Sequence, residues 1–255
     1  MSRRMLLTAL AGLPSIKRGD DLPALIIAAM ARETIAAEDG DILVLAQKIV
    51  SKSEGRQVWL RDVTPGPRAI QMAEETKKDP RVVELILQES SAVLRCHFGV
   101  IVVEHKSGLV MANAGIDASN VDDAAEDESV LLLPEDADAS ATRLRATLRE
   151  KLGCDIGIVI NDSFGRAWRN GTIGTAIGLS GPPGLWDMRG LPDRNGRLLR
   201  HTEVAIADEL AAAASLVMGQ GAEGLPVVHV RGFPLAFRQS SLRELLRDAS
   251  HDMFR

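Results

Sequence analysis

Apolar positions follow two different periods along the chain, and together they predict a mixture of strands and helices. Short apolar runs bounded by polar turns predict strands at residues 5–10, 41–47, 100–112 (two strands around a turn at 107–108), 130–133, 156–160 and 226–231. Helical spacing predicts helices at residues 22–37, 68–77, 80–90, 136–153 and 201–217, and a capping box at Ser241 and Glu244 predicts a last helix. Because the two kinds of element do not alternate strictly, the order favours an α+β fold over a doubly wound sheet.

Composition narrows the classes of function. A chain of 255 residues makes one large domain or two small ones. The net charge of −5 gives no electrostatic reason to expect nucleic acid as a partner, and no apolar run approaches the length of a membrane span. Cys96 and Cys154 are far apart and form no CxxC motif, which predicts a reducing, cytoplasmic location without a zinc site or disulfide framework. We expect Cys96 to be a small buried thiol.

The polar stretch at residues 113–121 (NAGIDASNV) directly follows the two central strands. It carries Asn113, Asp117, Ser119 and Asn120 within eight positions and has no cation among them. Taken alone, it is explained by an Asx-type turn, in which Asn and Asp side chains bind their own backbone. The alternative is a loop that delivers oxygen ligands to a site on a rigid scaffold.

A second polar stretch of the same kind favours the alternative. The apolar run 156–160 predicts a strand that ends abruptly in Asn161, Asp162 and Ser163. Mg²⁺ prefers oxygen ligands and keeps several waters, so one or two carboxylates can hold an ion. Asp117 and Asp162, each expected at the end of its own strand, therefore form a candidate metal pair. Arg166 and Arg169 follow in the same loop and suit either phosphate binding or surface ion pairs.

Three cations recur at every fourth position after the strand at residues 41–47. Lys48, Lys52 and Arg56 suit phosphate oxygens at the end of a strand, but a solvated helix face explains the same spacing. Further along, the Gly-rich stretch 171–184 has no Walker or GxGxxG signature. Small residues in a strand indicate close approach of another backbone or of a ligand.

Nine short motifs occur in an order that resembles the coenzyme F420-0:L-glutamate ligase (F420-0 γ-glutamyl ligase) family. They are GLPSI at 12–16, GDD at 19–21, QKIVSKSEG at 47–55, NAGIDASNV at 113–121, DSFGR at 162–166, ADEL at 207–210, VMG at 217–219, PVV at 226–228 and RG at 231–232. Each short motif alone is weak evidence for the family, whereas NAGIDASNV together with the other motifs is specific to it. The likeness covers nearly the whole chain and matches the stand-alone form, with no fused nitroreductase-like domain.

This resemblance implies a set of binding residues for GTP and metal. GTP would be held by residues from several segments, including the turn at residues 218–225: Leu13, Pro14, Ser15, Ile16, Gln47, Lys52, Asn120, Met218, Gly219 and Gly221. Two divalent ions, Mg²⁺ or Mn²⁺, would be bound by Asp117, Asp162, Ser163 and Gln220, with K⁺ as a further candidate ion. Some relatives have an acid where this chain has Gln220, so we expect a weaker second site.

The resemblance also implies a fold and a reaction. The fold would be a family-specific α+β unit over residues 1–255, with up to two lobes, that intertwines as a homodimer and is neither ATP-grasp nor Rossmann. GTP would phosphorylate a carboxylate of the deazaflavin coenzyme F420-0, and the amine of L-glutamate would displace phosphate from the acyl phosphate, adding one or more glutamates. Asp117, Asp162 and Lys52 would serve this chemistry, since phosphoryl transfer depends on positioning and charge neutralisation. Glu54, Asp208 and Glu209 are candidate bases for the amine.

Two other classes of function fit the same residues. A metal-dependent hydrolase of GTP or another phosphate ester would need the same carboxylates and cations but no glutamate. A non-catalytic nucleotide-binding or redox-partner module would bind GTP and metal without turnover.

Overall fold

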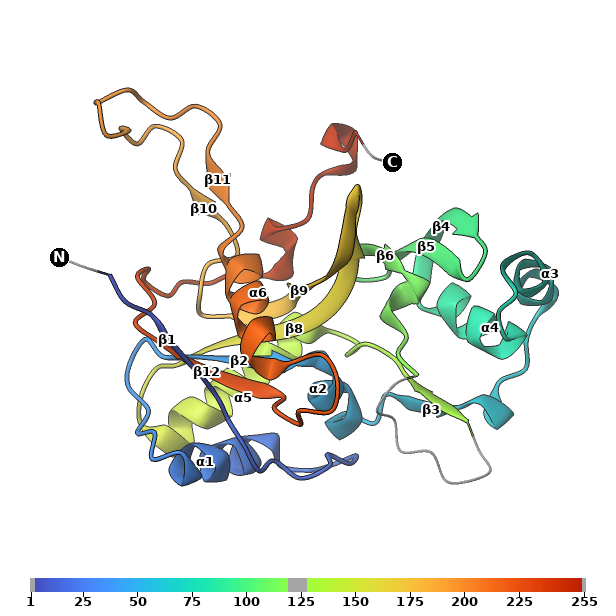
Figure 1. Cartoon of the computed structure of the whole chain (residues 1–255), viewed down its shortest axis with the longest axis horizontal. Coiled ribbons are helices and arrows are strands. Elements are labelled where there is room, and N and C mark those ends of the chain that lie inside the picture. Colours follow the sequence, from blue (N-terminus) through green and yellow to red (C-terminus); the bar gives the residue numbers. More distant parts are fainter. Residues whose placement is uncertain (1–2, 119–127, 254–255) are drawn as a thin grey trace.

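A mixed five-stranded sheet lies at the centre of the molecule (Figure 1). The computed structural model describes residues 3–118 and 128–253. In spatial order the strands are β1 (Leu6–Ala9), β12 (Val227–Arg231), β2 (Ile42–Ala46), β8 (Gly157–Arg166) and β9 (Arg169–Ser180). Only β2 and β8 pair in parallel, and the other neighbours are antiparallel. The C-terminal end of β2 and the middle of β8 therefore meet at one edge of the sheet.

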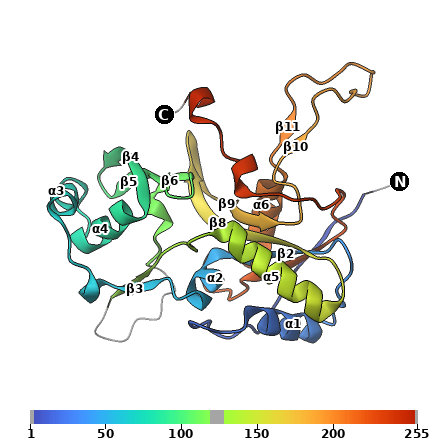
Figure 2. The ribbon, with the colours of Figure 1, turned by 180° about the vertical axis from the view of Figure 1, so that it is seen from behind.

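Helices cover both faces of this sheet. The helix α6 (Ile206–Met218) lies on the face towards the viewer in Figure 1, and α5 (Ala137–Leu152) and α1 (Leu22–Arg32) lie on the opposite face, as Figure 2 shows. Two glycines of β9 allow this close packing: a Cβ at Gly174 would lie 2.4 Å from Ala211 O of α6, and one at Gly178 would lie 2.6 Å from Ala137 Cβ of α5. Residues four positions apart on a regular strand share one face of the sheet. Gly174 and Gly178 face opposite sides because a bulge shifts the β8–β9 register after Ile160. The predicted close backbone approach in the Gly-rich stretch is confirmed.

A smaller layer adjoins the central sheet. It contains α3 (Pro67–Thr76) and α4 (Pro80–Gln88), which pack on a three-stranded sheet of β4 (Ser90–His97), β5 (Val100–His105) and β6 (Val110–Ala112). This layer has its own apolar cluster, which includes the following residues: Ala69, Met72, Val83, Ile86, Ile101 and Val103. The elements that connect it to the central sheet are α2 (Gln47–Ser53) and the paired strands β3 (Gln57–Trp59) and β7 (Ser129–Leu131). The remaining pair, β10 (Trp186–Asp187) and β11 (Glu203–Val204), begins and ends a long excursion. The prediction of a single ligase unit stays a prediction.

Most predicted elements are confirmed, and their ends show where local sequence misleads. The helix predicted at 136–153 is present, with Asp136 accepting a hydrogen bond from Ala139 N at its start and Gly153 at φ +74 at its end. The first helix is capped by Asp21, and it ends at Arg32 and not at residue 37, because Thr34 adopts a left-handed φ of +55. The Ala-rich helix begins at Ile206 and not at 201, since Glu203 and Val204 pair with β10.

Three predictions are wrong. The strand at 156–160 does not end in polar residues: β8 continues to Arg166, because β9 provides a hydrogen-bonded partner along its whole length. The last helix is only the 3₁₀ turn η3 (Leu242–Glu244), since the Glu244 carboxylate pairs with Arg238 and does not close a capping box. Cys96 is exposed and not buried, since it lies on β4 at the surface of the smaller layer.

The helices of the protein are short or polar compared with membrane-spanning segments. Among the described residues, none is both long and apolar enough to cross a bilayer.

Candidate active site

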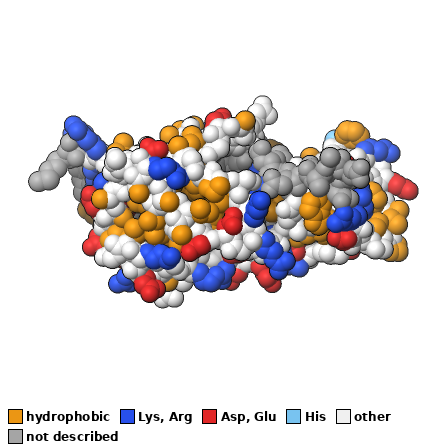
Figure 3. All heavy atoms as spheres, turned by 90° about the horizontal axis from the view of Figure 1, so that it is seen from below, with side chains coloured by type: hydrophobic (Ala, Val, Ile, Leu, Met, Phe, Trp, Pro, Cys, Tyr) orange, Lys and Arg blue, Asp and Glu red, His pale blue; other side chains and the backbone are white. Residues whose placement is uncertain are grey.

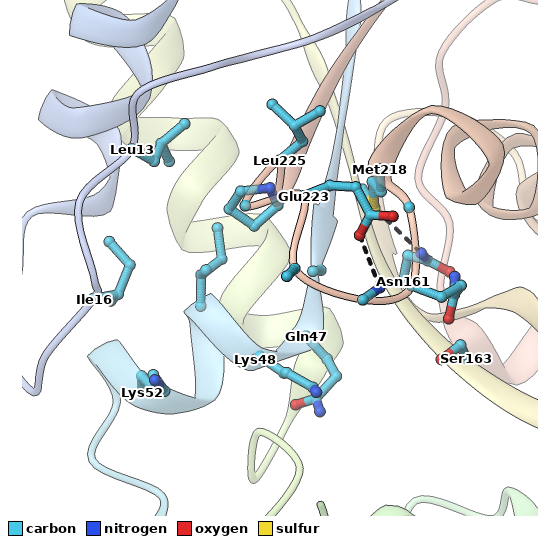
Figure 4. Close-up of a pocket in the computed structure, with 18 of the residues that line it drawn as sticks. Leu13, Ile16, Gln47, Lys48, Lys52, Asn161, Ser163, Met218, Glu223 and Leu225 are labelled. Carbon is cyan, nitrogen blue, oxygen red and sulfur yellow. Dashed lines mark hydrogen bonds between the residues drawn. The ribbon is translucent and has the colours of Figure 1, made fainter. Parts of the chain in front are cut away.

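A cavity of about 650 Å³ opens where β2 ends and β8 passes it. Five segments that are distant in sequence line it. They contribute residues 13–16, 46–49 with Lys52, Asp117, 161–163 and 218–226. Figure 4 shows the labelled side chains of these segments around one common space, with Leu13 and Ile16 on one side and Asn161 and Ser163 on the other. Of the predicted site residues, only Asn120 cannot be placed, because it lies outside the described residues.

The helix α2 carries the cations of the cavity. It starts directly at the end of the buried strand β2, so Gln47 is buried and its Oε1 accepts a hydrogen bond from Ser51 Oγ at 2.8 Å. Lys48 and Lys52 are one turn apart, which places both on the face that lines the cavity. Arg56 lies beyond the helix and instead binds Glu89 and the Leu133 carbonyl. Lys48 and Lys52 thus line the cavity, whereas Arg56 lies neither there nor on a solvated helix face.

Asp117 is fixed by its backbone and paired through its side chain. Its N–H donates to Leu131 O at 3.0 Å, and its carbonyl accepts from Leu131 N at 2.8 Å, which extends the β7 pairing by one bridge. Its Oδ2 lies 2.6 Å from Lys48 Nζ. Asn113, at the start of the same stretch, uses its side-chain oxygen to accept from Ile101 N of β5 at 3.0 Å, a distant backbone group, so the Asx-type turn expected there is wrong for Asn113.

Asp162 lies on β8, just beyond the bulge at Ile160–Asn161. Removal from water raises the pKa of Asp162 to about 6, and the charge of Asp117 acts in the same direction. A hydrogen bond from Ser163 N and the charge of Lys48 oppose this increase without cancelling it. The charge of Asp117 therefore acts on Asp162, and the positive charge of Lys48 offsets its effect and that of burial only in part.

Two buried amide atoms in the lining have no hydrogen-bond partner among the described residues. They are Gln47 Nε2 and Asn161 Oδ1. Buried polar groups are nearly always satisfied, so these two unsatisfied atoms on lining residues mark an incomplete set of polar contacts beside the cavity. Asn161 was noted only as a strand end in the sequence. Its position immediately after a fully buried run was the signal available.

The turn after α6 closes one side of the cavity. Gly219 has φ +76, and a Cβ there would lie 2.2 Å from Glu223 Cδ, so the turn requires glycine at this position. The Glu223 carboxylate accepts from Gly221 N at 2.8 Å and holds the turn together. Glu223 lies within the turn at residues 218–225 that the resemblance assigns to GTP, but no role was predicted for Glu223 itself.

The donor atoms in this cavity fit a hard divalent cation. Asp117 and Asp162 supply carboxylates, Ser163 is an exposed hydroxyl, and Gln220 donates its Nε2 to Ser215 Oγ at 2.7 Å, which leaves its carbonyl oxygen as an acceptor. Within residues 3–118 and 128–253, no group of three or more His, Cys, Asp or Glu side chains is arranged to hold a metal. Two carboxylates plus neutral oxygens suit Mg²⁺, which commonly binds to one or two carboxylates and to substrate phosphates.

The structure does not bring every candidate into the cavity. Arg166 and Arg169 lie at the β8–β9 turn, outside the lining. The three candidate bases also lie outside it: Glu54 binds Ser140 and Arg143, Asp208 accepts from Ala176 N, and Glu209 is exposed on α6. Glu54 and Asp208 therefore have structural roles, and the lining offers Asp162 and Glu223 as its other carboxylates besides Asp117.

Comparison with known proteins decides the family. The model of the F420-0:Gamma-glutamyl ligase family matches residues 12–232. The chain belongs to this family. Two relatives named coenzyme F420:L-glutamate ligase, from Methanothermobacter thermautotrophicus and Methanopyrus kandleri, are 46% and 45% identical, covering 96% and 94% of this chain and 96% and 93% of their own lengths. A third with that name, from Archaeoglobus fulgidus, is 42% identical over 96% of this chain and 94% of its own length. All five segments that line the cavity fall inside the part matched to the F420-0:gamma-glutamyl ligase family.

Proposed function

We propose that this chain is a GTP-dependent ligase that joins L-glutamate to coenzyme F420-0 by an amide bond, and that the cavity is its active site. The observation that carries the proposal is the convergence of residues 13–16, Gln47, Lys52, Asp117, 161–163 and 218–226 on one cavity. The sequence had selected nearly all of these segments from the family resemblance, without knowledge of their positions. The names of the relatives support the same reaction.

The first step is transfer of the γ-phosphoryl group from GTP to a carboxylate of the acceptor. The bond between phosphorus and the GDP oxygen breaks, and a bond to the carboxylate oxygen forms, which gives an acyl phosphate. In the second step the glutamate amine attacks the carbonyl carbon, phosphate leaves, and the amine loses a proton. The cations on α2, Lys48 and Lys52, lie where they can attract phosphate oxygens.

Asp117, Asp162, Ser163 and the Gln220 carbonyl are the groups that would hold divalent ions, Mg²⁺ or Mn²⁺. A bound ion would supply charge neutralisation for the phosphoryl group. The chain's own residues contribute the rest: Gln47 Nε2 and Asn161 Oδ1 are available to orient a polar ligand, and the turn around Gly219 excludes water from one side. A homodimer and a cytoplasmic location complete the proposal.

The deciding experiment measures phosphate release from GTP in the presence of L-glutamate, F420-0 and Mg²⁺ or Mn²⁺, followed by the mass of the coenzyme product. We expect a mass gain of one or more glutamyl units that disappears when GTP, metal or glutamate is omitted. Phosphate release that is indifferent to glutamate and F420-0 would indicate a hydrolase. Binding of GTP and metal without turnover would indicate a nucleotide-binding module.

A further inference from the structure

A second, smaller cleft adjoins the active-site cavity and shares Ile16 and Lys52 with it. It has a volume of about 240 Å³ and is also lined by Lys17, Arg18, Gly55, Gln57 and Trp59. We call it the basic cleft, because three of these described residues are cations and none is an acid. Its volume is below the range of about 300–1,000 Å³ that is usual for pockets holding drug-sized ligands, so it suits an amino acid better than a tricyclic coenzyme.

The cations of this cleft are held by the backbone around them. The loop that carries them is attached to the end of α2, since Gly19 N donates to Ser53 O at 2.9 Å. The side chain of Arg18 lies over Gly55, where a Cβ would come within 2.7 Å of Arg18 Cδ and Nε. Gly55 has φ +73, so it meets two requirements that other residues do not: the left-handed backbone and the space for Arg18. Within the described part of the chain, neither the Lys17 ammonium nor the Arg18 guanidinium has an ion-pair partner, so both are available to an anion.

The opposite wall is a short strand. Gln57 and Trp59 are two positions apart on β3 and therefore present their side chains on the same side. Gln57 Nε2 donates to Ser129 Oγ at 2.9 Å, and the Arg61 guanidinium lies 5.5 Å from the Trp59 ring centroid, so both side chains are oriented. Figure 3, which shows the molecule from below, has Lys and Arg side chains interspersed with acidic ones on that face. The surface in that view carries charges of both signs, whereas the lining of the basic cleft carries cations and no acid.

The position of the cleft relates it to the reaction. Lys48 contacts Asp117, and Lys52, which belongs to both cavities, lies one turn further along α2. One helical turn advances about 5.4 Å. The basic cleft therefore borders the active-site cavity at Lys52, one helical turn from the lysine that contacts Asp117.

We propose that the basic cleft binds L-glutamate, with Arg18 and Lys17 as carboxylate partners and Lys52 at the border with the phosphate site. Glutamate carries two carboxylates, and its amine must reach the acyl phosphate in the neighbouring cavity. The planar guanidinium of Arg18 suits bidentate binding of one carboxylate. This assignment rests on the ligase function proposed above.

The test compares Arg18→Gln, Lys17→Gln and the conservative Arg18→Lys with the wild type under full reaction conditions. We expect Arg18→Gln to raise the KM for L-glutamate about 10- to 100-fold, as the loss of a charge-assisted hydrogen bond predicts, and to leave the KM values for GTP and F420-0 unchanged. Lys17→Gln should give a smaller increase, and Arg18→Lys should restore part of the loss. The matched control is Arg194→Gln, an exposed arginine on the excursion between β10 and β11.

A second readout separates carboxylate binding from a general effect on structure. The wild type should prefer L-glutamate over L-glutamine in kcat/KM, since glutamine offers the same amine but lacks the second carboxylate. In Arg18→Gln this preference should fall, whereas a structural role would lower both values and keep their ratio. Thermal unfolding of each variant confirms that it is folded.

The outcomes distinguish this assignment from the proposed function. A wild type that forms no glutamyl product overturns the ligase function and this assignment together. A productive wild type with an unchanged glutamate KM in Arg18→Gln overturns only the assignment. An increase confined to the KM for GTP or for F420-0 also overturns it, because the cleft would then belong to that substrate.

Discussion

Two carboxylates at opposite ends of the central sheet show how the same residue type serves stability in one place and ligand binding in another. Asp41 precedes β2 and is 2% exposed, with Arg231 Nη2 at 2.7 Å and His229 Nε2 at 2.8 Å. Burial acts to raise its pKa, but the hydrogen bonds from Arg231 and the close contact with His229 prevail, and the pKa of Asp41 is lowered. Asp162 lies past the other end of β2, and its pKa is raised to about 6.

The difference lies in the balance of charge around each group. Asp41 is surrounded by cationic and donor groups of this chain, so its ionised form is satisfied within the fold. Asp162 shares its surroundings with Asp117, and Lys48 is the cation that acts on both. A carboxylate that the fold leaves incompletely neutralised is a candidate for a functional site, because a bound cation or ligand can supply what is missing.

The largest expected effect is the loss of activity at the second carboxylate. Asp162→Asn and Asp117→Asn should each lower the rate of glutamyl-product formation by at least about 100-fold, since each removes a negatively charged ligand for the ion that would neutralise the phosphoryl group. Both variants should unfold at nearly the wild-type temperature. Glu150→Gln, an exposed acid on α5, is the matched control and should keep full activity. Full activity in either Asp variant would refute the metal assignment.

The next effect is a loss of stability at the first carboxylate. Asp41→Asn should lower the free energy of unfolding by about 2 kcal/mol, because the buried Asp41 side chain loses its charge-assisted hydrogen bonds with Arg231, whose own side chain is 34% exposed and keeps Glu38 as a partner. Urea denaturation measures this change, with Asp162→Asn as the contrasting variant. The comparison between the two ends fails if Asp41→Asn is no more destabilising than Asp162→Asn.

The pH dependence should have opposite signs at the two groups. The lowered pKa of Asp41 means that its contribution to stability is present above its ordinary value of 3.8 and is lost as pH falls through the lower folded value. The raised pKa of Asp162 means that its contribution is present below 3.8 and is lost as pH rises through about 6. In metal-free protein, the stability of wild type relative to Asp162→Asn should therefore decrease between pH 4 and pH 6.

Divalent ions should reverse that decrease. Binding needs the ionised carboxylate, so the apparent affinity for Mn²⁺ should increase as pH rises through about 6. Denaturation curves with and without Mn²⁺ over this pH range measure both effects. A pH-independent difference between wild type and Asp162→Asn would show that Asp162 titrates normally.

The smallest effect concerns the neutral donor of the proposed metal set. Gln220→Glu adds a negative charge beside Asp117 and Asp162 and should strengthen binding of a divalent ion about tenfold. Isothermal titration with Mn²⁺ compares it with wild type and with Gln220→Ala. If the wild type and both variants bind Mn²⁺ with equal affinity, Gln220 is not a metal ligand, and its role is the hydrogen bond to Ser215.

The sequence indicated most of the residues in the cavity but not their local structure. Asp162 was selected because it follows a buried run, and it does lie in the cavity, although β8 does not end there. An apolar run gives way to polar residues both where a strand ends and where a strand continues with one face exposed. Only the pairing with β9 shows that the second case holds for β8. The individual roles of Glu223 and Asn161 were not predicted for a related reason: they depend on contacts with Gly221 and Met218 that local sequence does not encode.

By itself, the sequence determined the mixed α+β character, the main strands and helices, and the family resemblance that the match over residues 12–232 confirmed. These follow from periodicity, caps and turn residues, which act over a few neighbouring positions. Only the tertiary structure decided that Arg56 pairs with Glu89 and does not line the cavity, that Asp117 contacts Lys48, and that a basic cleft adjoins the cavity. These depend on distant segments meeting in space, where burial and charge balance are set by the whole fold and not by any one stretch of it.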